Sequence, residues 1–395
     1  MSLYRRTACC GPLHPGSPLW SIGFRPLFLL AGMFALLSIA VWVAQFAGWL
    51  GSFTYFASTQ WHAHEMIFGY TFAVVVGFLF TAVRNWTHHP TPSGYALLTV
   101  VVCWIAARAC VASGLLAVAA IADTAFATLA ALGIAIPLFK ARNLRNAIFV
   151  LIILSLGAAN IAFYVAASRA SAATMQTVIQ LGLDLILLVI TVVAGRVIPM
   201  FSASAGKGAS PQRNTFIECT AIASAVLLTA VHVIGLPLIA IWIAGIGALA
   251  HGARLTMWKP WTAMRMPILL ILHASYAWLV IYLALLTLSG LGFVSYSIAL
   301  HALTVGAIGG LTIGMMSRVA RGHTGRPLIA NRLEVYAYTL IQLAGATRVL
   351  LPIVLPNFYF SEIVVAGALW SAAFFLLTVF FLPTMTRPRA DGRAS

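Results

Sequence analysis

Long apolar runs, separated by short polar or basic breaks, fill almost the whole chain. A helix that crosses a membrane needs roughly 20 mostly apolar residues, because hydrocarbon offers no water to the backbone groups. Read between proline, glycine and charged breaks, the sequence predicts twelve such helices, at about 24–46, 61–83, 95–113, 115–138, 146–168, 177–200, 215–234, 236–253, 267–289, 294–317, 332–351 and 361–383. We therefore expect an all-α polytopic membrane protein in which residues 1–395 form one integral membrane domain.

The composition agrees with this fold class and excludes a soluble domain. The 395 residues are 62% hydrophobic and 8% charged, so no segment is polar enough to fold separately in water. The net charge of +16 comes from basic residues scattered between apolar runs, which argues for contact with membrane lipid and against a nucleic-acid partner. The five cysteines, which include Cys9 and Cys10, form no CxxC pair, and we expect them to be reduced.

The basic residues also predict the orientation of the chain. Lysine and arginine concentrate in cytoplasmic loops. With the N-terminus inside, 20 of the 23 Lys and Arg residues fall on the inner side, and only Arg108, Arg169 and Arg348 fall outside. Missing one helix would reverse this alternation in every later loop. The pattern therefore supports both the number of helices and cytoplasmic N- and C-termini.

The second, sixth and tenth predicted helices end in similar basic motifs. These are Val83-Arg84, Gly195-Arg196-Val197 and Ser317-Arg318-Val319. Their spacing of four helices is consistent with three four-helix pseudo-repeats, although the match is short.

Glycines recur every four residues on the tenth predicted helix, at Gly306, Gly310 and Gly314. Such a stripe favours close packing against another helix. A face without side chains would equally admit a porphyrin plane below His301.

Ionisable side chains inside predicted spans are costly and therefore indicate function. The second helix opens with Trp61-His62-Ala63-His64-Glu65-Met66, and the sixth and tenth carry Asp184 and His301 at similar depth. Neutral imidazole is the commonest transition-metal ligand and an axial ligand of haem. We expect a metal site that takes its ligands from His62, His64 and His301, with Glu65 and Asp184 as hydrogen-bonding neighbours.

The His62–His64 spacing restricts how this site is built. Residues i and i+2 of a helix point about 200° apart. The two imidazoles therefore cannot chelate one ion unless the first turn is unwound, and on a regular helix one of them faces a second site or an orienting partner. Glu65 is three residues after His62 and is expected on its face, as a hydrogen-bond acceptor or proton carrier.

A second set of polar residues is predicted near the inner face. His251 ends the eighth helix, His273 begins the ninth, and His323 follows in an inner loop. Arg196 and Arg318 could pair with the propionates of a haem, or report only the topology. These five residues are the candidates for cofactor binding, and the simplest alternative for each histidine is a hydrogen bond to a backbone carbonyl.

Four segments of the chain resemble the NnrS family: 61–70, 195–201, 301–310 and 316–327. The similarity spans nearly the whole chain. It implies a bacterial cytoplasmic (inner) membrane protein of twelve spans that contains haem b and copper and belongs to the response to nitric oxide and nitrosative stress, as in denitrification. The family's motif histidines fall on His62, His64, His301 and His323, with His251 and His273 as less secure matches.

Three functions agree with these observations. The first is a haem and copper protein that binds or processes nitric oxide, or another small gas, with an unidentified electron donor. The second is a transporter for copper or another small solute, since twelve spans and pseudo-repeats also suit a carrier. The third is an electron-transfer enzyme of the haem–copper type. The sequence lacks the six or so buried histidines and the histidine–tyrosine pairing which that type requires.

Overall fold

The computed structural model describes residues 14–51, 55–204 and 210–393, and every regular element in these ranges is helical. The α-helices are α1 (Phe24–Phe46), α2 (Ser58–His64), α3 (Phe72–Thr87), α4 (Gly94–Ala112), α5 (Leu116–Lys140), α6 (Ile148–Ser168), α7 (Ala172–Ser204), α8 (Thr215–Ile234), α9 (Pro237–Met257), α10 (Pro267–Gly290), α11 (Tyr296–His301), α12 (Gly310–His323), α13 (Arg332–Val354) and α14 (Tyr359–Thr386). Two π-helices are η3 (Glu65–Thr71) and η6 (Ala302–Gly309). Short 3₁₀ turns are η2 (Pro18–Trp20), η4 (Leu144–Asn146), η5 (Pro260–Ala263) and η7 (Pro356–Phe358).

Twelve helical segments of the described chain are long and apolar enough to cross a membrane, which confirms the predicted number and fold class. The second span joins α2, η3 and α3, and the tenth joins α11, η6 and α12. The tight connections expected near 113–115 and 234–236 turn at Gly114 and Gly235, whose φ angles are +74° and +81°. Glycine adopts this left-handed conformation without the clash that a Cβ atom causes.

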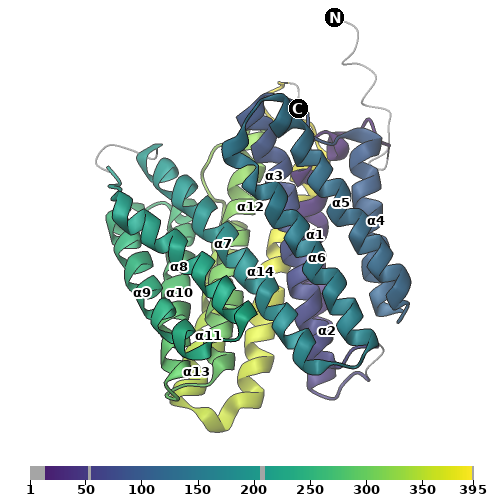
Figure 1. Cartoon of the computed structure of the whole chain (residues 1–395). Helices are drawn as coiled ribbons and strands as arrows, with labels where there is room; N and C mark the ends of the chain where they lie inside the picture. Colours follow the sequence, from purple (N-terminus) through teal and green to yellow (C-terminus); the bar gives the residue numbers. More distant parts are fainter. Residues whose placement is uncertain (1–13, 52–54, 205–209, 394–395) are drawn as a thin grey trace, which may run out of the picture.

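The second, sixth and tenth spans form the centre of the bundle. The buried share of their apolar windows is 89%, 67% and 67%, whereas that of the other spans lies between 28% and 61%. The sixth span is α7, which crosses the bundle diagonally in Figure 1. Their spacing of four spans agrees with the arrangement that four-helix pseudo-repeats would produce.

The first and last spans close the bundle, because α1 packs along α14. The Trp370 indole donates a hydrogen bond to the Ala35 carbonyl at 3.1 Å. The fully buried Arg25 donates to the carbonyls of Met385 and Arg387 at 2.9 and 2.8 Å. We call the end of the bundle where α1 begins and α14 ends the basic end (Figure 1). It holds the segments predicted to be cytoplasmic, and the orientation itself stays a prediction.

The glycine stripe of the tenth span is covered by α10. A Cβ atom on Gly306 would collide with the Trp278 ring, and one on Gly314 would lie 2.8 Å from Leu272. Ser275 occupies the corresponding place beside Gly310. The stripe thus serves close helix packing, and this face leaves no room for a porphyrin.

Three of the cysteines lie in the described ranges and are free: Cys103, Cys110 and Cys219. Cys9 and Cys10 lie outside the described residues.

Candidate functional site

Two candidate histidines occupy equivalent places in their spans. His64 is the last residue of α2, and His301 is the last residue of α11. A π-helix begins directly after each of them. π-Helical turns are rare and frequently occur at functional sites, since the wider turn changes the direction of the side chains that follow. Apolar periodicity in the sequence gives no signal for this feature.

His64 is fully buried, and oxygen atoms engage both of its ring nitrogens. Nδ1 lies 2.9 Å from Oε1 of Glu65, and Nε2 lies 2.8 Å from Oδ1 of Asn160. The spacing predicts Glu65 on the face of His62, whereas the structure joins Glu65 to His64. The π-helix η3 starts at Glu65 and turns its side chain toward α4 and α5. Metal ligation by His64 would require one of these hydrogen bonds to break.

Glu65 also belongs to a buried ionic cluster. Arg108 on α4 donates from Nη1 to both carboxylate oxygens of Glu65 at 2.7 Å. Its Nη2 donates to Asp123 on α5 at 2.6 and 2.5 Å, and Tyr164 donates to Asp123 at 2.7 Å. All four side chains are buried. We call His64, Glu65, Arg108, Asp123 and Tyr164 the His64 cluster. Arg108, an exception to the charge pattern of the loops, is therefore an internal partner of two carboxylates.

His62 points away from the His64 cluster, as the i to i+2 spacing predicts. Its ring stacks on the indole of Trp42, with centroids 4.2 Å apart and planes at 22°. No hydrogen bond joins its ring nitrogens to another described residue, which leaves them available to a ligand.

His301 lies in the same region as His62. Arg348 donates to Ser297 and Tyr359, and the neighbouring Phe360 stacks on Phe46, whose ring packs beside that of Trp42. Nδ1 of His301 donates to the carbonyl of Ser297 at 2.6 Å, which fixes the proton on that nitrogen. A backbone carbonyl in this position is the usual way to orient a metal-binding imidazole, whose Nε2 then carries the lone pair. Arg348, another exception to the charge pattern, interacts electrostatically with both imidazoles. The structure therefore brings His62 and His301 together and directs His64 elsewhere.

Asp184 forms a separate cluster on α7. It accepts a hydrogen bond from Nδ1 of His232 at 2.8 Å and one from Gln180 at 2.9 Å. Gln180 in turn accepts a hydrogen bond from Tyr296. This contact joins residues 48 positions apart, and no local pattern in the sequence indicates it.

His251 and His273 are both fully or almost fully buried toward the basic end. Nδ1 of His251 lies 2.6 Å from the hydroxyl of Tyr276, and the backbone of Ala221 lies near the same ring. Nε2 of His273 lies 3.1 Å from the hydroxyl of Ser202. Nδ1 of His273 is buried without a hydrogen-bond partner in the described structure. A buried imidazole nitrogen without a partner suits a metal ligand, because a ligand would remove the cost of leaving it unpaired.

Arg254 is the positively charged side chain that lies beside His251 and His273. It donates from Nε to Glu218 at 2.9 Å and from Nη1 to the Thr191 carbonyl at 2.8 Å. The close approach of Gly195 makes this possible, since a Cβ atom there would collide with the guanidinium group. Glycine in the Gly195-Arg196-Val197 motif therefore has a packing reason.

The remaining candidates lie at the basic end. His323 is the last residue of α12, which corrects its expected place in a loop, and its ring packs on Phe24 with centroids 5.8 Å apart. Arg196 donates to Asn146 at 2.7 Å. Arg318 lies over the ring of Phe201 at 3.7 Å, is mostly buried, and forms no ion pair with a described carboxylate. Arg318 is therefore a cation whose charge an anionic group bound at the basic end would neutralise.

Taken together, the described ranges contain no group of three or more His, Cys, Asp or Glu side chains arranged to hold a metal ion. By position, the candidate histidines instead fall into two imidazole pairs, His62 with His301 near one end of the bundle and His251 with His273 toward the basic end. Either pair supplies two nitrogen ligands, and further ligands would come from the bound group itself.

Sequence comparison gives one match. The model of a protein family described as NnrS protein matches residues 18–389, a range that contains every candidate residue discussed above. A search of curated proteins finds no match.

Proposed function

Because this chain belongs to the NnrS family, we propose that it binds or processes nitric oxide at a histidine-built site that holds haem b and copper. Family membership supports a role in the nitric oxide response in general. The two cofactors and the redox step are the finer parts of the proposal. The twelve spans make it a multi-pass membrane protein, which we place in the bacterial cytoplasmic membrane.

The observation that carries the proposal is the His62–His301 pair at the π-helical break of the tenth span. Nε2 of His301 is left for a ligand because Nδ1 is bound to the Ser297 carbonyl. Haem iron, when bound, supplies a site for nitric oxide, and copper on soft or imidazole ligands supplies one-electron chemistry. His62 and His301 would hold one group, and His251 and His273 the other.

The arginines of the basic end fit the anionic side of a haem. Arg318 is mostly buried over Phe201 and lacks a described carboxylate partner, and a propionate would neutralise it. Arg196 and His323 lie at the same end and could extend this contact. Glu65 and Asp184 are engaged by other side chains, so their proposed role is to hold His64 and His232 in place.

The electron-transfer alternative gains one observation. The hydrogen bond between Tyr276 and His251 is a buried histidine–tyrosine contact that the sequence spacing does not reveal. An enzyme of this kind would reduce its substrate with electrons from a donor, so turnover with a chemical reductant separates it from a protein that only binds nitric oxide.

The test is an optical spectrum and metal analysis of detergent-purified protein produced with haem and copper supplied. We compare the wild type with His301→Ala, His62→Ala and His273→Ala, and use His88→Asn, at an exposed loop histidine, as the control. We expect a haem band and copper in the wild type and control, and the loss of one cofactor in particular variants. Wild-type protein with neither cofactor would contradict the proposal and favour a transporter.

A further inference from the structure

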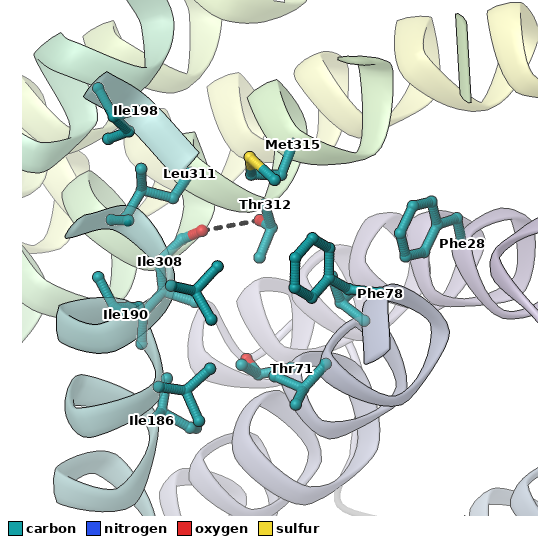
Figure 2. Close-up of a pocket in the computed structure, with 15 residues that line it drawn as sticks. Phe28, Thr71, Phe78, Ile186, Ile190, Ile198, Ile308, Leu311, Thr312 and Met315 are labelled. Carbon is teal, nitrogen blue, oxygen red and sulfur yellow. Dashed lines mark hydrogen bonds between the residues drawn. The ribbon is translucent and has the colours of Figure 1, made fainter. Parts of the chain in front are cut away.

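An apolar cavity of about 90 Å³ lies where the second, sixth and tenth spans meet. Figure 2 shows side chains from the three spans around it. Its walls include Val74 and Phe78 from the second span, Ile190 and Val193 from the sixth, and Ile308 and Met315 from the tenth. The three most buried spans of the bundle therefore leave a space at their own crossing.

The lining offers no free polar group. Only two of the lining residues, Thr71 and Thr312, have hydroxyls. Thr71 donates to the Met66 carbonyl at 2.7 Å, and Thr312 donates to the Ile308 carbonyl at 2.7 Å, the bond drawn in Figure 2. The Tyr70 hydroxyl forms a further hydrogen bond with the Thr312 hydroxyl, at 2.5 Å. The space is partly open rather than sealed, and because a buried water needs two to four polar partners, its lining favours apolar ligands over water.

The cavity lies between the two imidazole pairs. Ile308 follows His301 by seven residues on the tenth span, at the far end of the π-helix η6. On the sixth span, Ile198 lines the cavity and accepts a hydrogen bond from Ser202, one turn further on. Ser202 is the residue that contacts His273. The same two helices therefore connect the cavity to both candidate sites.

We infer that this cavity is a binding site for one small uncharged gas molecule, held by dispersion contacts alone. Its volume and lining exclude hydrated ions, since Met315 provides the only sulfur and one thioether does not replace a hydration shell. That the gas in question is nitric oxide, and that it moves through the cavity toward the imidazoles, rests on the function proposed above. The site itself rests only on the geometry of the three spans.

Xenon is the probe, because it is inert, apolar and independent of haem and copper. Xenon NMR of the full-length protein in detergent micelles, titrated with xenon pressure, separates a saturable site from linear partition into the micelle. Val193→Phe fills the cavity. Val102→Phe, the same substitution at a lipid-facing position of α4 that is 53% exposed, is the matched control. Leu311→Ala enlarges the cavity from the tenth span.

We expect a saturable xenon signal in the wild type and in Val102→Phe, its loss in Val193→Phe, and stronger binding in Leu311→Ala. A purely linear wild-type response, or wild-type binding in Val193→Phe, would overturn the inference. If Val193→Phe does not fold, Leu311→Ala provides the test. A xenon affinity of Leu311→Ala equal to that of the wild type would also overturn the inference.

A second measurement separates this inference from the proposed function. In stopped-flow mixing with nitric oxide, Val193→Phe should bind the gas more slowly than Val102→Phe and reach the same final spectrum. An unchanged rate would remove the cavity from the path of nitric oxide, even if xenon binds there. Absence of a haem spectrum from the wild-type protein would refute the proposed function, but it would not affect the xenon result.

Discussion

Arg108→Met removes the cation that touches both carboxylates of the His64 cluster. In the structure, the guanidinium group bridges Glu65 and Asp123 through four contacts between 2.5 and 2.7 Å. The two carboxylates and the arginine sum to one negative charge, and Nδ1 of His64 lies 2.9 Å from one oxygen of Glu65. Methionine replaces the side chain only as far as about the Nε position, and it removes the charge and all four hydrogen bonds.

The magnitude follows from what remains buried. Removing one partner of a buried ion pair typically costs about 3–5 kcal/mol, because the other charge is left uncompensated. Arg108 compensates two carboxylates, so we expect Arg108→Met to lie at or above the upper part of that range. A loss of about 4–5 kcal/mol changes the unfolding equilibrium by roughly 1,000-fold to 5,000-fold. Glu65→Gln leaves the Arg108–Asp123 pair balanced, and we expect about 1–3 kcal/mol for it.

The assay is reversible unfolding of the purified protein by sodium dodecyl sulfate in mixed micelles, followed by tryptophan fluorescence. Trp104 donates to the Gly69 carbonyl at 2.9 Å, one turn beyond Glu65, and reports on this region. Arg169→Met is the matched control, since Arg169 is exposed and belongs to the same predicted side of the membrane. We expect the control to stay within about 0.5 kcal/mol of the wild type.

Two results would refute the reasoning. One is an Arg108→Met protein whose free energy of unfolding lies within about 1 kcal/mol of the wild-type value, well below the cost of an uncompensated buried charge. The other is the reversed order, with Glu65→Gln less stable than Arg108→Met. Either would mean that water or another cation reaches the two carboxylates.

Two further predictions concern the basic end. Gly195→Ala places a methyl group against the Arg254 guanidinium and should lower the midpoint of thermal unfolding. In the control Gly252→Ala, the new Cβ atom would meet only one side-chain atom, at 3.6 Å, and the midpoint should stay almost unchanged. Equal midpoints for the two variants would contradict this packing. Hydrogen bonds from Arg389 lower the pKa of Asp391 from 3.8 to about 2. Its stabilising contact is therefore present above about pH 4 and lost as the pH falls through about 2. NMR titration of this labelled carboxyl group should give a midpoint near 2, and a midpoint near 3.8 would contradict the prediction.

The number of spans could be predicted from the sequence because hydrocarbon demands about 20 apolar residues per crossing. The divergence of His62 and His64 could also be predicted, since it follows from helix geometry alone. The structure gives each imidazole its own partner, Trp42 for His62 and Glu65 with Asn160 for His64.

Other features depend on contacts between distant segments, and no local pattern indicates them. The predicted position of Glu65 on the face of His62 is wrong, because the π-helix η3 redirects its side chain. Apolar periodicity in the sequence does not distinguish a π-turn from an α-turn. From its depth in the membrane alone, Asp184 is predicted to lie near the other candidate residues. Depth does not specify which face of a helix meets which neighbour, and the structure pairs Asp184 with His232.

The contact between the first and last spans determines the order in which the molecule can be completed. Arg25 is fully buried, and its hydrogen bond to the Met385 carbonyl joins residues 360 positions apart. During synthesis, this hydrogen bond can therefore form only after the twelfth span has left the ribosome. Loss of the last span would strip α1 of a packing surface and of the carbonyls that satisfy Arg25. Membrane insertion can thus proceed span by span, whereas the packing of α1 on α14 forms only once the C-terminal helix is in place.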